Sequence, residues 1–204
     1  AFQNYADVFA KLGYPVKLDF TSIFPPQGGN LRLLPPEIGT KKAFQEWIGI
    51  APFAAHKQKV YPPEMLEKVI TMITKEHPSC RVFLFGKGPD EDPVINGMVS
   101  RNAQCVNASA VLSGIAQELV LMSHLDVMVS MDSANMHFAS LVNTPVVSIW
   151  GATHPYAGFM GWGQKPLNAI QIELGCRPCS IFGNKPCLRG DLACLRNISP
   201  EMVY

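Results

Sequence analysis

Apolar positions recur along this chain with two periods, one typical of helices and one typical of strands. Helical spacing predicts helices over residues 2–12, 63–76, 90–100 and 115–122. Short alternating or continuous apolar runs predict strands over residues 16–20, 47–51, 81–85, 105–107, 126–130, 146–150 and 169–174. From residue 47 onward, strands and helices alternate. This order predicts the α/β class, with a parallel sheet wound by right-handed crossovers.

A stretch rich in proline and glycine follows the first helix and strand. Its breakers are Pro25, Pro26, Gly28, Gly29, Pro35 and Pro36. This composition is typical of a linker rather than of a core. We therefore expect residues 1–21 to end one domain, residues 22–46 to be a linker, and residues 47–204 to form a second domain. The chain starts at Ala1 rather than at a methionine, which we expect of an internal fragment or a processed protein.

The most informative segment runs from Val127 to Gly151 and reads as a strand, a polar turn, a short helix and a second strand. Asp132, Ser133 and Asn135 lie where the helix should begin, beyond the end of the first strand. Backbone N–H groups and the helix dipole at such a position can hold a phosphate group. A plain helix cap by Asp132 or Ser133 is the alternative interpretation.

Other polar residues also follow predicted strands, and ligands of parallel sheets bind beyond the carboxyl ends of the strands. Lys57 and Lys59 are suited to phosphate oxygens, unless they only solvate an exposed loop. Asp90 is suited to ribose hydroxyls, unless it caps the next helix. His137 is placed to contact a ligand phosphate, unless it is an ordinary packed or surface histidine.

Charge and hydropathy narrow the possible partners. The net charge is +1 and charged residues make up 16% of the chain, which gives no basic surface for nucleic acid. No apolar run is long enough for a membrane-spanning helix, and the first twelve residues lack the layout of a signal peptide. We therefore expect a cytoplasmic protein.

Six cysteines are present, and the last four form a cluster. Cys80 and Cys105 fall at the edges of predicted strands and resemble ordinary small apolar residues. The cluster follows the pattern C-x2-C-x7-C-x6-C and consists of Cys176, Cys179, Cys187 and Cys194. Reduced thiols, partial disulfides and a structural zinc site are the three interpretations, with zinc the least favoured of them.

Two loops together resemble the C-terminal half of glycosyltransferase family 9, the ADP-heptose:lipopolysaccharide heptosyltransferase family. Residues 49–62 read G-I-A-P-F-A-A-H-K-Q-K-V-Y-P, with Lys59 at the lysine of the family motif. Residues 132–151 match the second motif at Asp132, Ser133, His137, Ala139, Thr144, Pro145 and Gly151. Ala134 and Asn135 replace the usual Gly-Pro, which puts in question a close approach of the backbone to phosphate. The resemblance covers roughly residues 47–195.

The resemblance implies a GT-B glycosyltransferase, whose two Rossmann-like domains face a cleft. This chain would supply the nucleotide-sugar domain, truncated at its C-terminus, with residues 1–21 as the end of the acceptor domain. The diphosphate-binding residues implied are Lys59, Asp132, Ser133, Ala134 and His137. Asp90 or Glu91 would bind the ribose or base.

The same resemblance implies inverting sugar transfer without a metal or other cofactor. The family's catalytic aspartate lies in a G-D motif near the start of the N-terminal domain. No such motif occurs near the start of this sequence, so we expect the chain alone to be inactive. The donor would be similar to ADP-heptose. The acceptor would be lipid-linked or an oligosaccharide, similar to lipopolysaccharide core. Any membrane association would be peripheral, at the inner face of the inner membrane.

Three other functions remain open from the sequence. A non-catalytic nucleotide-binding module would bind nucleotide without transferring sugar. Another GT-B-like enzyme, such as a sugar-nucleotide epimerase, would need acidic and histidine groups at the donor sugar that the sequence does not identify. A zinc-stabilised interaction domain would depend on the four clustered cysteines.

Overall fold

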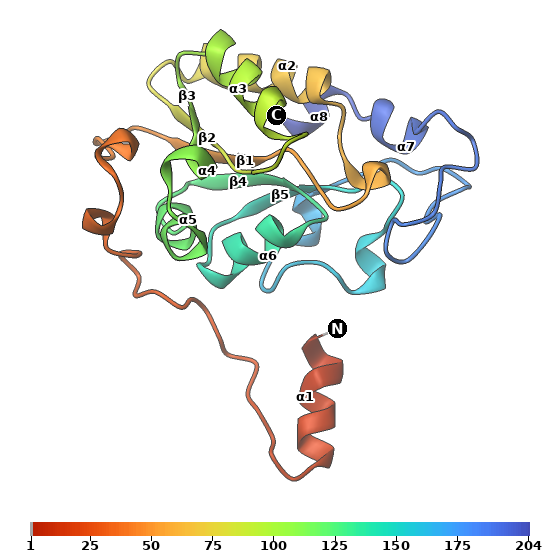
Figure 1. The fold of residues 1–204 in the computed structure, drawn as a ribbon. Helices are drawn as coiled ribbons and strands as arrows, with labels where there is room; N and C mark the ends of the chain where they lie inside the picture. Colours follow the sequence, from red (N-terminus) through yellow and green to blue (C-terminus); the bar gives the residue numbers. More distant parts are fainter. Residues whose placement is uncertain (1) are drawn as a thin grey trace.

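Six parallel strands form the centre of the molecule in a computed structural model that describes residues 2–204 (Figure 1). Their order across the sheet is β3-β2-β1-β4-β5-β6. The strands are β1 (Trp47–Ala51), β2 (Arg81–Leu84), β3 (Cys105–Asn107), β4 (Val127–Met131), β5 (Val146–Ile149) and β6 (Ala169–Ile170). The expected α/β architecture with a parallel sheet is confirmed.

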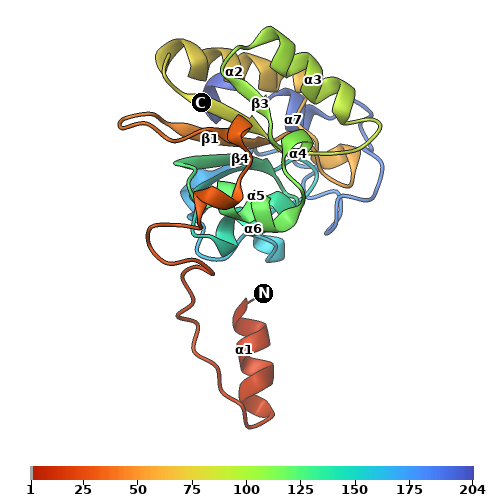
Figure 2. The same ribbon diagram turned by 60° about the vertical axis from the view of Figure 1, so that its left-hand side comes forward.

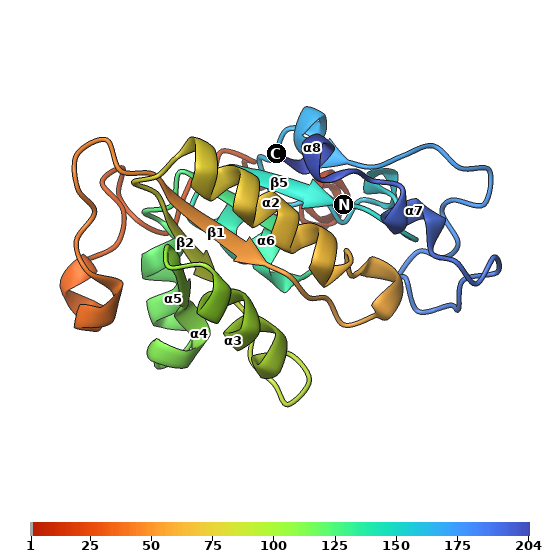
Figure 3. The same cartoon turned by 90° about the horizontal axis from the view of Figure 1, so that it is seen from above.

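Helices cover both faces of the sheet (Figures 1 and 3). One face carries α2 (Pro63–Glu76), α3 (Asp92–Arg101), α7 (Ala193–Arg196) and α8 (Pro200–Val203). The other carries α4 (Ala108–Val111), α5 (Ile115–Met122) and α6 (Ala134–Leu141). Every residue of β1 is buried because helices shield both of its sides.

The sheet order fixes where a ligand can bind. The chain runs outward from β1 through β2 to β3 and then returns to place β4 on the other side of β1. At such a reversal the loops after two neighbouring strands diverge to opposite faces and leave a crevice beyond their carboxyl ends. The loops that follow β1 and β4 therefore flank the crevice.

Two predicted strands differ from the structure. Residues 16–20 form no strand, and Val16, Leu18 and Phe20 remain 41–49% exposed, because no neighbouring strand is there to pair with them. The strand predicted over 169–174 stops at Ile170, because β5 ends at Ile149 and offers the later residues no partner. The helix predicted from residue 90 begins at Asp92.

The N-terminal arm, residues 2–22, lies apart from the sheet (Figure 2). It consists of α1 (Phe2–Lys11) followed by extended chain. The aromatic ring of Phe2 contacts Trp162 edge-on at 4.9 Å, and the indole N–H of Trp162 donates to the Phe20 carbonyl at 2.8 Å. These are contacts of the arm's two ends, and they leave the middle of the arm exposed.

The segment that joins the arm to β1 packs on the domain. It contains two short 3-10 helices, η1 (Leu31–Leu33) and η2 (Pro36–Ile38), and Ile38 is fully buried in the core. The Gly29 N–H donates to the Ser123 hydroxyl at 2.8 Å. None of the helices within residues 2–204 is long and apolar enough to cross a membrane.

Candidate functional site

A cavity of about 440 Å³ opens at the carboxyl ends of β1 and β4. Its walls come from the loop after β1, the loop after β2, the start of α6 and two later loops. The lining residues are Phe53, Ala54, Ala55, Lys59, Phe85, Gly86, Glu91, Asp132, Ser133, Ala134, Asn135, His137, Phe159, Ile181 and Phe182. All five residues expected to bind diphosphate therefore lie in one cavity, together with Glu91.

Lys59 reaches the cavity from a short 3-10 helix, η3 (Lys57–Lys59), which ends just before Pro62 and Pro63 begin α2. Its ammonium lies 3.3 Å from Oδ2 of Asp132. The side chains of Lys59 and Asp132 are 13% and 7% exposed. The buried Thr153 hydroxyl donates to the same carboxylate oxygen at 2.9 Å. Asp132 thus orients the lysine, and Thr153 orients Asp132.

The start of α6 presents backbone N–H groups to the same cavity. Ser133 is the N-cap residue, yet its side chain makes no capping hydrogen bond and instead lies 3.2 Å from the Ser130 hydroxyl. Asp132 is engaged by Lys59 and Thr153. The alternative that either residue is a plain side-chain cap is therefore wrong. The uncapped N–H groups can bind an anion, and Lys59 supplies a positive charge nearby.

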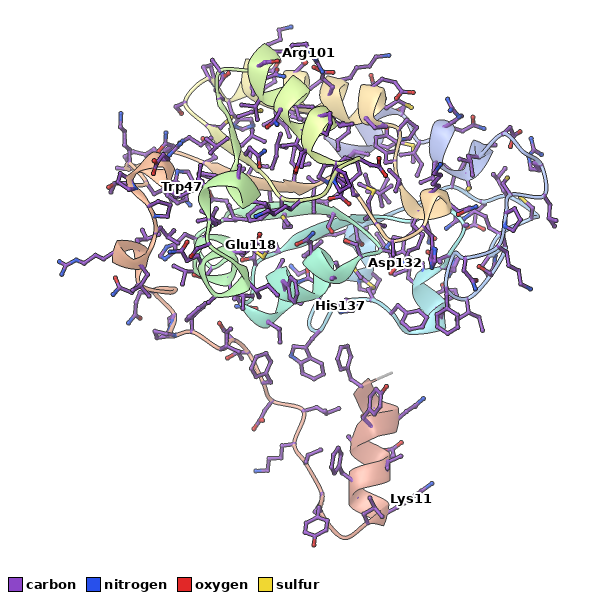
Figure 4. The ribbon with its side chains drawn as sticks, in the orientation of Figure 1. Lys11, Trp47, Arg101, Glu118, Asp132 and His137 are labelled. Atoms are coloured by element: carbon purple, nitrogen blue, oxygen red, sulfur yellow. The ribbon has the colours of Figure 1, made fainter. Side chains whose placement is uncertain are left out.

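His137 lies one turn into α6 (Figure 4). It is one of the residues that line the cavity. It is half-buried. Burial lowers the pKa of its imidazole below the ordinary value; nearby Asp132 opposes the shift and Lys59 adds to it. A neutral imidazole at this position can donate or accept a hydrogen bond without adding charge.

Of the two adjacent acidic residues expected to bind ribose or base, Glu91 lines the cavity and Asp90 does not. Glu91 lines the cavity, and its Oε2 accepts a hydrogen bond from the Lys87 N–H at 3.0 Å. Asp90 is exposed and lies in a neighbouring hollow with Lys57 and Arg196. Asp90 is also not a side-chain cap, because the bonds that close this turn come from Glu91 and Asp92. Glu91 is the better placed of the two.

Several lining or supporting residues were not predicted from the sequence. Thr153 bonds Asp132 from the loop after β5, and Phe159, Ile181 and Phe182 close the cavity from later loops. The sequence carries no ligand-typical signal at these residues. Only the position of Thr153, shortly after a buried strand, could have pointed to it.

The cysteine loop, residues 176–194, follows β6. All six cysteines of the chain are free thiols. Within residues 2–204 no group of three or more His, Cys, Asp or Glu side chains is close enough to hold a metal ion. Cys194 is buried as a small apolar side chain, whereas backbone N–H groups of Leu192, Arg189 and Gly190 lower the pKa of Cys187. The thiols as placed do not fit a four-cysteine zinc site, and partial disulfides are not formed.

A family model described as glycosyltransferase family 9 (heptosyltransferase) matches residues 28–185. The match spans more than half of the chain and includes every lining residue of the cavity. No curated protein sequence matches the chain significantly.

Solved structures show the same fold. E. coli ADP-heptose LPS heptosyltransferase II superposes with a TM-score of 0.60 at 19% identity, over 82% of this chain and 47% of that one. E. coli heptosyltransferase WaaC with ADP-2-deoxy-2-fluoro heptose gives 0.54 at 18% identity, over 81% and 43%. The dodecameric iron-containing heptosyltransferase TibC, from enterotoxigenic E. coli, in complex with ADP-D-beta-D-heptose gives 0.53 at 18% identity, over 82% and 46%. The chain spans less than half the length of these structures, whose likeness concerns the fold alone.

Proposed function

The chain belongs to glycosyltransferase family 9, and from that premise we propose that its cavity binds the diphosphate of a nucleotide-diphospho-sugar donor. The observation that carries the proposal is the convergence of Lys59 and the uncapped start of α6 on one cavity. A diphosphate bridging them would meet an ammonium group on one side and backbone N–H groups on the other. Structures similar in fold were solved with ADP-heptose and an analogue of it, which supports an ADP-heptose-like donor.

The geometry suits the departure of a nucleoside diphosphate. When the bond between the sugar and the diphosphate breaks, negative charge grows on the diphosphate oxygens. Lys59 and the α6 N–H groups are fixed before the reaction, so they stabilise that charge without rearranging. His137 and Asn135 line the same wall and are placed to hydrogen-bond the phosphates or the sugar. Glu91 at the opposite wall is suited to the ribose hydroxyls.

The proposal assigns the rest of the reaction to a second domain. A general base there would deprotonate the acceptor hydroxyl, which attacks the anomeric carbon with inversion. The acceptor is a lipid-linked sugar or oligosaccharide similar to lipopolysaccharide core. The protein acts in the cytoplasm, at the inner face of the inner membrane. The 204-residue chain alone binds donor and transfers no sugar, and it needs no metal for binding.

Calorimetric titration with ADP, GDP and UDP tests donor binding. At least one diphosphate should bind, and Lys59→Ala should weaken that binding by about 1.5–3 kcal/mol while changing binding of the nucleoside much less. Lys57→Ala is the matched control, because Lys57 belongs to the same 3-10 helix, is exposed and lies outside this cavity. Folded protein that binds none of the three at millimolar concentration would refute the proposal.

Sugar transfer separates the proposal from a non-catalytic nucleotide-binding module. The full two-domain protein should release nucleoside diphosphate in the presence of donor and acceptor, and Lys59→Ala should slow that release. The isolated 204-residue chain should release no nucleoside diphosphate under the same conditions. Binding without transfer by the full protein would favour the module instead, and turnover by the isolated chain would contradict the assignment of the base to a second domain.

A further inference from the structure

The cysteine loop returns to the diphosphate site and touches Lys59 through Gly183. Gly183 is buried, with φ of +74°. A Cβ atom at this position would lie 2.7 Å from Cγ and 2.8 Å from Cδ of Lys59, and 3.3 Å from Cγ2 of Thr153. Contacts below 3.0 Å are too close for carbon atoms, so a side chain at residue 183 would force the stem of Lys59 or the loop backbone to shift.

Arg177 ties the same loop to the chain that carries Thr153. Its guanidinium donates to three backbone carbonyls, those of Gly151, Ile172 and Thr153, of which the bond to Thr153 measures 2.9 Å. The Cys179 N–H donates to the Ala152 carbonyl at 2.9 Å. Residues 151–153 are therefore held along their length by the cysteine loop, and the hydroxyl of Thr153 is directed at Asp132.

A lysine needs such support more than most cationic side chains. Its ammonium sits on a flexible four-carbon stem whose rotamers must be restricted before the charge has a fixed position. In this site the stem is bounded by the Gly183 backbone, and the ammonium is bounded by Asp132. Thr153 is near both constraints, because its hydroxyl bonds Asp132 and its methyl group would lie 3.3 Å from a Cβ atom at residue 183.

We propose that Gly183 is a positioning residue for Lys59. We also propose that Arg177 fixes the cysteine loop relative to residues 151–153, so that Gly183 stays against the side chain of Lys59. The cysteine loop thereby sets the place of the cation that meets the diphosphate. The proposal rests on the proposed function for its consequence in nucleotide binding. Its geometric part concerns Lys59 alone and can be measured without a ligand.

Gly183→Ala and Gly190→Ala form a matched pair that isolates the contact. Both glycines lie in the cysteine loop with nearly the same left-handed φ, +74° and +76°, so alanine strains the backbone equally at each. A Cβ at Gly190 would meet nothing within 4 Å. Gly183→Ala should weaken ADP binding about tenfold, as expected for a displaced charge-assisted contact, and should change adenosine binding little. Gly190→Ala should leave both near the wild-type values.

Reductive methylation of Lys59, followed by mass spectrometry, gives the ligand-free readout. The modification rate of Lys59 should rise in Gly183→Ala and stay at the wild-type value in Gly190→Ala, with Lys57 as an internal reference. In a Lys59→Ala background, Gly183→Ala should cause no further loss of ADP affinity, because the two substitutions act on one contact. If wild-type protein binds no nucleoside diphosphate, the proposed function fails, and the Lys59 modification rates still decide the positioning role.

Arg177→Gln tests the second part, with Arg189→Gln as its control. Arg189 lies in the same loop, its side chain is 52% exposed, and it pairs with Asp191. Arg177→Gln should weaken ADP binding and raise the Lys59 modification rate, and Arg189→Gln should do neither. The proposal would be overturned if Gly183→Ala and Gly190→Ala weakened ADP binding and adenosine binding to the same extent. It would also be overturned if the modification rate of Lys59 were unchanged in Gly183→Ala.

Discussion

Two helices of this chain, α1 and α2, are both amphipathic, but only α2 is built into the core. In α2 the apolar stripe Leu66, Val69, Ile70 and Ile73 is buried against the sheet. In α1 the only buried residue is Ala6, and Val8 remains 54% exposed. The two patterns are alike in period and differ in whether another element covers them.

An apolar pattern therefore specifies a helix or strand and leaves open what covers it. A helix gains most of its stability in a protein from packing its apolar face. The exposed stripe of α1 and the exposed residues that follow it are what a surface covered by another domain would present. An acceptor domain that ends with residues 1–21, as we expect from the sequence, would provide such a cover.

Truncating one valine in each helix should separate α1 from α2 most strongly, through the free energy of unfolding. Val69→Ala in α2 should lower the free energy of unfolding by about 2–3 kcal/mol, because Val69 is fully buried and alanine leaves a cavity. Val8→Ala in α1 should change it by less than about 0.5 kcal/mol. Urea denaturation measures the free energy of unfolding of both variants. Both substitutions replace valine with alanine in a helix, so the gain in helix propensity is the same in each and cancels in the comparison. Similar losses in the two variants would show that α1 is packed in solution.

A smaller difference is expected between two hydrogen bonds. Thr153→Val keeps the shape of the side chain but removes the donor to Asp132, which should lower the free energy of unfolding by about 1.5 kcal/mol because the acceptor is charged and buried. Gln3→Ala removes the exposed bond from Gln3 to Asp7 in α1, worth about 0.5 kcal/mol or less. Thermal unfolding of both variants measures the two losses of stability, and the loss in Thr153→Val should be clearly the larger.

The pH dependence of stability should separate the two regions further, because the arm contains no histidine. Burial lowers the pKa of His137 in the folded state below its ordinary value of 6.5. The unfolded chain therefore binds the proton first as pH falls. The contribution of neutral His137 is complete above about pH 6.5 and declines as pH falls through that value toward the lowered pKa. Urea denaturation at several pH values from 5 to 8 gives the free energy of unfolding as a function of pH. This free energy should fall less steeply toward low pH for His137→Gln than for wild type, and equal pH dependence in the two proteins would contradict the prediction.

Removal of metal ions should change the stability of the cysteine loop little or not at all. The C-terminal part of the core includes Cys194, which is 4% exposed and packs as an apolar residue. If burial alone holds this region, a chelator should leave the Tm unchanged, and metal analysis of purified protein should find no stoichiometric zinc. A chelator that lowers the Tm, with bound metal lost in proportion, would show that the four clustered cysteines rearrange into a site.

The sequence predicted the sheet well because burial on both faces leaves continuous apolar runs at β1 and β4. It failed at residues 16–20, where alternation suggested a strand but residues 2–204 contain no strand that pairs with it. Strand formation depends on a neighbour that may lie anywhere in the chain or outside it, and a local period carries no information about that neighbour.

The candidate site was predictable where its residues lie in the segments that follow strands. Lys59 follows β1, and Asp132 and His137 follow β4; parallel topology brings these segments to one edge of the sheet, and the chemistry of the three residues points to phosphate. Thr153 and Gly183 were not found, because each acts through another side chain and neither is a ligand-typical residue. Their roles depend on tertiary packing between segments far apart in sequence.

The strand order has a consequence for folding kinetics. Neighbours β1, β2 and β3 follow one another in sequence, as do β4, β5 and β6, but the central pairing joins Ile48 to Val127 across the whole first half. Local pairs close early and long-range pairs close late, because the loop entropy must be overcome first. Lys59 comes from the first half and Asp132 from the second. We therefore expect refolding protein to regain its far-ultraviolet circular dichroism before it can bind nucleotide, with the cavity the last part to assemble.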